Sequence, residues 1–285
     1  MNRFCALSLL PKAWLLLAVL TLACGAKPEA DPRPLVAVSV LPQKQLVERI
    51  AGDHVRTAVM IPAGANPTSY SPTLANMKDL SEADLYVKVG HPNFPFEKSW
   101  LKPLLDEREE LIVVDCSEKI AAPEVDPHIW VTPENAGAIA LIIKNGLTAV
   151  LPAEREAFDQ NLSVLLDELA ALDQEIRDHL ADRRSDTFFV LHPAWGYFAQ
   201  TYGLQQVAIE RDHKSPDPRR LALIIDQARR ENARYILVQP QFNPDPARTV
   251  ADAVGAEVMV VDPLAYDWPQ SLRKLSRSMK AETEN

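Results

Sequence analysis

The sequence predicts an α/β protein of two parallel-sheet lobes joined by one long helix. Short apolar runs of strand type alternate with helical patterns along the chain, as expected for parallel sheets. Four such runs precede a single long helical pattern and four follow it. The 285 residues are 47% hydrophobic, which suits one large or two medium cores.

The N-terminal lobe is expected over residues 35–151. Its strand candidates are Leu35–Val40, Val55–Ile61, Leu85–Gly90 and Leu111–Cys116. Helical segments such as Gln43–Ala51 and Leu74–Glu82 lie between them. Strands and helices that alternate at this spacing indicate one parallel sheet of four strands.

The linking helix is expected over residues 152–184, beginning at Pro152. Its apolar residues recur every three or four positions, namely Phe158, Leu162, Leu165, Leu166, Leu169, Leu172, Ile176 and Leu180. At about 1.5 Å per residue such a helix is roughly 45–50 Å long. A coiled-coil or partner helix is the alternative, but a single helix between two α/β halves is expected to pack on both and to limit their hinge motion.

The C-terminal lobe is expected over residues 185–285 and repeats the pattern of the first. Its strand candidates are Phe188–His192, Gln206–Ile209, Tyr235–Gln239 and Val258–Asp262. Helical patterns such as Arg219–Glu231 and Pro246–Val254 alternate with them. A second parallel sheet of four strands follows from this order.

Residues 1–23 are expected to be a signal peptide of the lipoprotein type. They carry Arg3 and Lys12, no acidic residue, and an apolar run ending at Ala23 that is too short to span a membrane. Cys24 then stands where such a signal receives its lipid; an ordinary cleaved signal and a spare cysteine are the alternative. Residues 24–34 form a polar tether, so the protein is expected to be lipid-anchored, in the periplasm or on the outer face of the membrane.

The composition argues against nucleic-acid and nucleotide binding. Subtracting Arg3 and Lys12 from the 30 basic residues leaves 28 against 39 acidic ones, a formal net charge of −11 that favours cationic partners. Neither G-x-x-x-x-G-K-[ST] nor G-x-G-x-x-G occurs. After Cys24 the next and last cysteine is Cys116, so no disulfide is expected within the domain.

Three good metal ligands stand where strand-like runs stop or a tight turn begins. FFVLH ends on His192, VMVVD ends on Asp262, and the DPHIW pentad presents His128. Open α/β sheets bind ligands at the carboxyl ends of their strands, so the three are expected to converge on one crevice. Simpler alternatives are a helix-capping role for His128, a histidine buried against backbone for His192, and a turn role for Asp262.

Six motifs, read in order, resemble a known family. They are GANPTSYSPT from Gly64, SEADLYVKVG, VDPHIW, HPAWGYFAQTYGL, VQPQF and VVDPL. Their order and spacing resemble those of the metal-binding lipoproteins of zinc and manganese ABC importers, the ZnuA/TroA-type group, from Leu35 to the end of the chain. The resemblance implies two lobes joined by a rigid helix, with the metal in the cleft between them and His128, His192 and Asp262 among its ligands. It also implies a monomer that delivers metal to an ABC permease and its ATPase without catalysis.

The first ligand position of that family is different here. Thr68 follows Pro67 where the family usually has His, and a neutral hydroxyl is a poor ligand for Zn²⁺. His91, one residue beyond Gly90 at the end of a predicted strand, is expected to fill the gap, with Glu210 or a bound water as the alternative. Two or three imidazoles with one carboxylate suit Zn²⁺, and Mn²⁺ is the second choice because it favours more carboxylates.

Two other functions use similar residues. An exported metallohydrolase would need an open metal position and a general base such as Glu97, Glu134 or Glu210, but no H-E-x-x-H or G-x-S-x-G motif supports it. A cell-surface adhesion lipoprotein would keep its metal as a structural ion.

The remaining aromatic residues and histidines near these motifs have simpler roles. Trp130, Trp195, Tyr197 and Phe198 are expected to pack around the site. His54, His179 and His213 stand among charged residues and are expected to face solvent.

Overall fold

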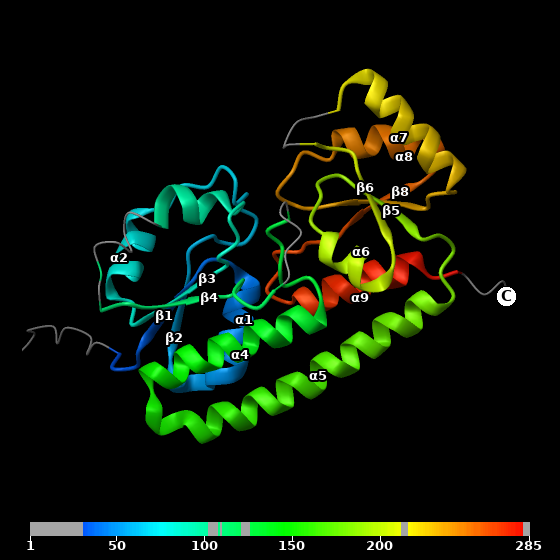
Figure 1. Ribbon diagram of the computed structural model, residues 1–285. Coiled ribbons are helices and arrows are strands. Elements are labelled where there is room, and N and C mark those ends of the chain that lie inside the picture. Colours follow the sequence, from blue (N-terminus) through cyan, green and yellow to red (C-terminus); the bar gives the residue numbers. More distant parts are fainter. Residues whose placement is uncertain (1–30, 102–107, 109, 121–125, 212–215, 282–285) are drawn as a thin grey trace, which may run out of the picture. The chain divides into compact units, whose positions relative to one another are not determined.

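The computed structural model describes residues 31–101, 108, 110–120, 126–211 and 216–281. The chain divides between Pro32 and Arg33, and the part from Arg33 onward contains both predicted lobes. Within it lie two separate four-stranded parallel sheets flanked by helices (Figure 1). The predicted fold class is confirmed. No helix in the described ranges is long and apolar enough to span a membrane.

The N-terminal sheet has the strand order β2-β1-β3-β4. Its strands are β1 (Leu35–Val38), β2 (Arg56–Val59), β3 (Leu85–Lys88) and β4 (Ile112–Asp115). Helices α1 (Leu41–Ala51), α2 (Leu74–Glu82) and α4 (Pro133–Val150) accompany it, with short helical turns at Gly52–His54 and Glu97–Leu101. The ends of every strand lie within two residues of the predicted ones.

The C-terminal sheet repeats this topology in the order β6-β5-β7-β8. Its strands are β5 (Thr187–Val190), β6 (Gln205–Ala208), β7 (Tyr235–Val238) and β8 (Glu257–Val260). Its helices are α6 (Gly196–Tyr202), α7 (Pro218–Arg230), α8 (Asp245–Val254) and α9 (Trp268–Met279). Strand order reverses between β5 and β7, so their carboxyl ends form the switch point at which such sheets bind ligands.

The linking helix α5 runs from Arg155 to Ala181 after a short turn at Pro152–Glu154 (Figure 1). Its buried face consists of Phe158, Leu162, Leu165, Leu169, Leu172, Ile176 and Leu180. This face contacts α1 and α4 beside the first sheet and α9 beside the second. The predicted packing of one helix on both lobes is therefore confirmed.

One hydrophobic core continues from the first lobe into the second. It includes β1 and β3, the buried face of α5, and residues such as Phe188, Trp195 and Trp268 of the C-terminal lobe. A second, smaller core covers the other face of the C-terminal sheet, around Ile209, Ile224 and Ile236. Parting the lobes would expose apolar surface, so the shared core opposes large hinge motion.

Candidate metal site

Three predicted ligands stand at one edge of the C-terminal sheet. His192, Glu210 and Asp262 each come two residues after the end of their strand, β5, β6 and β8. The register of β5 and β6 ends with Val190 opposite Ala208, and a backbone hydrogen bond from Glu210 N–H to the Leu191 carbonyl, at 2.9 Å, continues it toward His192. The distance from His192 Nδ1 to Glu210 Oε2 is 3.4 Å. Parallel pairing therefore brings an imidazole and a carboxylate together at this edge.

His192 is held both at its ring and at its backbone. Its ring stacks on Phe242 with 4.3 Å between centroids and an interplanar angle of 18°. Its backbone carbonyl accepts a hydrogen bond of 2.8 Å from Gln239 Nε2. The residue is only 6% exposed. A stacked, buried ring has little rotamer freedom, which suits a ligand that must keep its direction.

The imidazole of His128 is fixed by a carboxylate. Asp126 Oδ1 accepts hydrogen bonds from the His128 backbone N–H, at 3.0 Å, and from the ring at Nδ1, at 2.7 Å. Burial raises the pKa of Asp126, but the charge of His128 and the hydrogen bonds from His128 and Gly196 outweigh it and hold that pKa below the ordinary value. An ionised carboxylate can only accept, so a neutral His128 ring carries its proton on Nδ1 and leaves the lone pair of Nε2 for a metal.

The two histidines lie next to each other. Their ring centroids are 6.3 Å apart with the planes at 76°, although 64 positions separate them in sequence. Predicted convergence is thus seen for His128 and His192. In the described part of the chain, however, no three His, Cys, Asp or Glu side chains are close enough together to hold one ion. A complete ligand shell would need these side chains to move closer.

Asp262 keeps one oxygen open. Its Oδ1 accepts hydrogen bonds from Gln241 Nε2, at 3.0 Å, and from the Leu264 backbone, at 2.9 Å. Its Oδ2 accepts none from the described residues. No hydrogen bond or ion pair joins Asp262 to either imidazole in those residues. Asp262 therefore has the turn role considered from sequence and also a carboxylate oxygen to offer.

Thr68 is not oriented as a ligand. It is exposed, and both its backbone N–H and its hydroxyl donate to Asn66 Oδ1, at 2.9 and 2.8 Å. These bonds turn the side chain onto its own loop. The expectation that another residue must complete the site agrees with this geometry.

His91 is buried but presents the wrong nitrogen for metal binding. It is 3% exposed, and the Asn93 backbone N–H donates to its Nδ1 at 3.1 Å. Because Nδ1 accepts, a neutral ring carries its proton on Nε2, and Nε2 has no hydrogen-bond partner within the described part of the chain. A protonated nitrogen has no lone pair for a metal, so this arrangement favours Glu210 over His91 as the additional ligand.

Of the three glutamates considered as general bases, Glu97 is committed elsewhere and Glu134 is exposed, whereas Glu210 lies beside His192. The Glu97 carboxylate accepts hydrogen bonds from the backbone of Val89, at 2.6 Å, from Gly90, at 2.9 Å, and from the Ser39 hydroxyl. Burial raises its pKa, although these hydrogen bonds offset part of the rise. Glu134 is exposed near the start of α4. Glu97 therefore secures the turn after β3.

The aromatic residues near the ligand motifs are buried, as predicted. Trp130, Trp195, Tyr197 and Phe198 are each less than 5% exposed. Trp130 Nε1 also donates to the Pro263 carbonyl at 2.7 Å. Burial, followed by the charge of Asp126, raises the pKa of Tyr197 to about 12, so its hydroxyl stays neutral. Trp130 lies directly beside one of the imidazoles, with its ring centroid 5.6 Å from that of His128.

The prediction for His179 is wrong. Its ring bonds to the Ser276 hydroxyl at 2.9 Å and its side chain is only 16% exposed, because α9 packs over this end of α5. His54 is 44% exposed, as predicted. Cys24 and His213 lie outside the described residues.

Three contributors to the site have weak sequence signals. Asp126 stands two residues before His128, a spacing at which an Asp side chain can bond back to the chain. Gln241 positions Asp262, and Phe242 stacks on His192. Gln and Phe are not residue types that mark metal sites, so sequence reasoning does not find Gln241 and Phe242.

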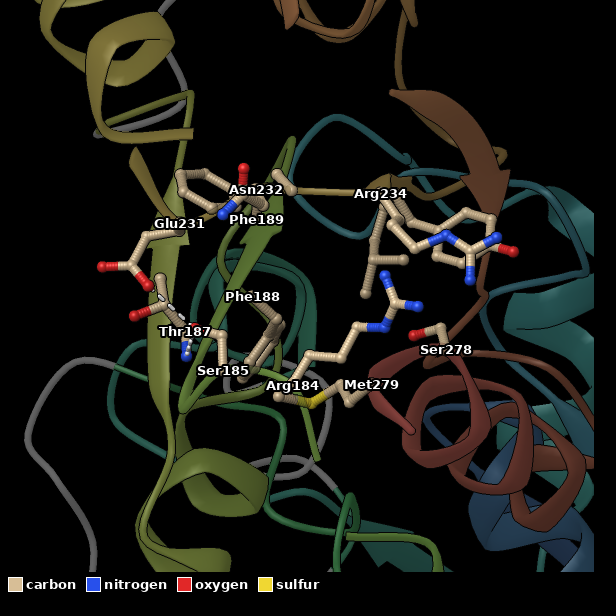
Figure 2. Close-up of a pocket in the computed structure, with 13 residues that line it drawn as sticks. Arg184, Ser185, Thr187, Phe188, Phe189, Glu231, Asn232, Arg234, Ser278 and Met279 are labelled. Carbon is tan, nitrogen blue, oxygen red and sulfur yellow. Dashed lines mark hydrogen bonds between the residues drawn. The ribbon is translucent and has the colours of Figure 1, made fainter. Parts of the chain in front are cut away.

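A pocket of about 50 Å³ in the C-terminal lobe is separate from this site. Figure 2 shows that Arg184, Thr187, Glu231, Arg234 and Ser278 are among the residues that line it. Thr187 begins β5, whereas His192 follows its end, so the pocket lies at the opposite edge of the sheet.

Comparison with known proteins identifies relatives over nearly the whole chain. The family model described as "Zinc-uptake complex component A periplasmic" matches residues 36–282. The zinc-binding lipoprotein AdcA of Streptococcus pneumoniae is 26% identical over 272 residues, which cover 87% of this chain and 54% of AdcA. The chain thus spans about half the length of the curated relatives it matches first.

Solved structures show the same fold. A crystal structure of ZnuA is 33% identical, with a TM-score of 0.81, and the match covers 86% of this chain and 97% of that chain. The laminin-binding protein Lmb of Streptococcus agalactiae, described as having adhesin and metal-transporting activity, is 25% identical with a TM-score of 0.77, covering 87% and 100%. From the family match and the shared fold, the chain belongs to the ZnuA family of zinc-uptake proteins.

Proposed function

We propose that this protein is an extracytoplasmic solute-binding protein that captures Zn²⁺ and delivers it to an ABC permease and its ATPase. The observation that carries the proposal is the meeting of two buried or half-buried imidazoles, His128 and His192, from distant segments. Asp126 holds the ring of His128 through Nδ1, and Glu210 Oε2 lies 3.4 Å from Nδ1 of His192. An imidazole that is oriented by a carboxylate is typical of protein metal sites.

The proposed ligands are His128, His192, Asp262 and Glu210. Two atoms bound to one tetrahedral zinc at about 2.0–2.1 Å lie about 3.3–3.4 Å apart. The separation of His192 Nδ1 and Glu210 Oε2, 3.4 Å, fits that edge. Glu210 Oε2 is buried and accepts no hydrogen bond from the described residues, as an oxygen available to a cation would be.

The metal is proposed to be zinc, with Mn²⁺ as the second choice. Two imidazoles and two carboxylates form a mixed nitrogen and oxygen set, and such sets bind Zn²⁺ more tightly than Mn²⁺. Competitive titration of the metal-free protein with both ions is expected to show Zn²⁺ bound at least about a hundredfold more tightly, roughly 2.7 kcal/mol. Equal affinities, or no binding of Zn²⁺, would refute the proposal.

Adhesion is a second candidate because Lmb is described as both adhesin and metal transporter. The two functions differ in what happens to the fold when a chelator removes the metal. If zinc is cargo, a chelator removes it and the metal-free protein keeps its circular dichroism spectrum. If zinc is structural, its removal unfolds the lobes.

The anchor is proposed to be a lipid on Cys24, which lies outside the described residues. One relative over most of this chain is a zinc-binding lipoprotein, which supports the proposal. Metabolic labelling with a fatty acid is expected to mark the wild type and not Cys24→Ala, because the thiol is the attachment point. Equal labelling of both proteins would contradict a lipid at this position. The anchored protein is proposed to act as a monomer.

A further inference from the structure

The segment that carries His128 is bonded to the C-terminal lobe at two points. The backbone N–H of Gly196, the first residue of α6, donates to Asp126 Oδ2 at 2.8 Å. The Trp130 indole donates to the carbonyl of Pro263, at 2.7 Å. His128 lies between these two bonds, so its position depends on the C-terminal lobe.

Asp126 uses both of its oxygens. Oδ1 accepts from the backbone and the ring of His128, and Oδ2 accepts from Gly196. One carboxylate thereby sets the tautomer of the ring and ties that ring to the lobe that bears His192. The side chain of Asp126 is only 13% exposed, so water competes only weakly for these hydrogen bonds.

Gly196 is required by this close approach. A Cβ built there would stand 2.7 Å from Asp126 Oδ2 and 3.5 Å from the carboxyl carbon. A methyl group at 2.7 Å from an oxygen is too close, so any side chain at position 196 must displace Asp126. The carboxylate of Asp126 therefore explains why position 196 is a glycine.

We infer that Asp126 and Gly196 act together as positioning residues that hold His128, with Nε2 open, at the distance from His192 that a shared metal needs. The inference rests on the proposed metal-binding function and adds two residues that touch no metal. It also explains how a site without a ligand at Thr68 is kept in order: one ligand is fastened to the lobe that supplies the others. Losing such outer contacts typically costs 10- to 100-fold in metal affinity.

The test is a double-mutant cycle with zinc. Gly196→Ala and Asp126→Asn are each expected to weaken Zn²⁺ binding by about tenfold or more. Because both act through one contact, the double variant is expected to bind no more than about threefold worse than the weaker single variant. Ring ¹⁵N chemical shifts of His128 in the metal-free proteins provide a second readout. They are expected to show Nδ1 protonated in the wild type and mixed tautomers in Asp126→Asn.

Gly137→Ala is the matched control, because a Cβ there meets only the flexible end of the Leu166 side chain, at 3.1 Å, and the more distant end of Leu169. It is expected to keep wild-type affinity, and thermal melting checks that all variants fold. Additive losses, unchanged affinity in either single variant, or an unchanged tautomer in Asp126→Asn would overturn the inference. Absence of zinc binding in the wild type would instead remove the proposed function itself.

Discussion

Alanine at either His128 or His192 is expected to weaken zinc binding at least about tenfold, roughly 1.4 kcal/mol, and alanine at both to abolish tight binding. The two rings are 6.3 Å apart, so one ion between them loses a nitrogen ligand in either variant. Carboxylates alone bind zinc less well than a mixed set with imidazole. Calorimetric titration of the metal-free proteins measures the effect directly.

The control for these variants is His54→Ala. His54 is 44% exposed and pairs with Glu154 at 3.4 Å, away from the site, so its loss is expected to leave zinc affinity unchanged. The metal-free His128→Ala protein is expected to stay folded, because His128 belongs to neither hydrophobic core. Wild-type affinity in both single variants would show that zinc binds elsewhere.

The fold could be predicted because the signals that determine it are local. Each strand is a short apolar run between helical patterns, and each observed strand ends within two residues of its predicted limits. Parallel pairing then explains why His192 and Glu210 meet, since both follow adjacent strands in register. Side chains that follow adjacent parallel strands meet because of the topology of the sheet, so their meeting can be predicted from the sequence.

The rest of the site depends on contacts between segments that no local pattern records. The approach of Gly196 to Asp126 joins residues 70 positions apart, and the stacking of Phe242 on His192 joins two different strand ends. The tautomer of His91 is decided by one backbone N–H, that of Asn93. The charged neighbours of His179 predict a ring that faces solvent, whereas the packing of α9 on α5 leaves its side chain only 16% exposed.

The choice between Glu210 and His91 has the second largest expected effect on affinity. Glu210→Gln keeps the size of the side chain but replaces a charged oxygen, and it is expected to weaken zinc binding about tenfold or more. His91→Ala is expected to change the affinity by less than about twofold, because the nitrogen it would offer carries a proton. Both variants are measured by the same competitive titration as the wild type.

Glu134→Gln serves as the control for charge, since that carboxylate is exposed near the start of α4 and its loss removes the same unit of charge from a solvated group. The opposite result, a tenfold loss in His91→Ala with Glu210→Gln unchanged, would mean that the bond from Asn93 breaks and the proton of His91 moves when zinc binds. In that case Thr68→His is expected to restore affinity to His91→Ala, since it supplies an imidazole from the loop where the family usually has one. If Glu210 is the ligand, the site draws its carboxylates and one imidazole from a single lobe, and only His128 must be held in place from outside it.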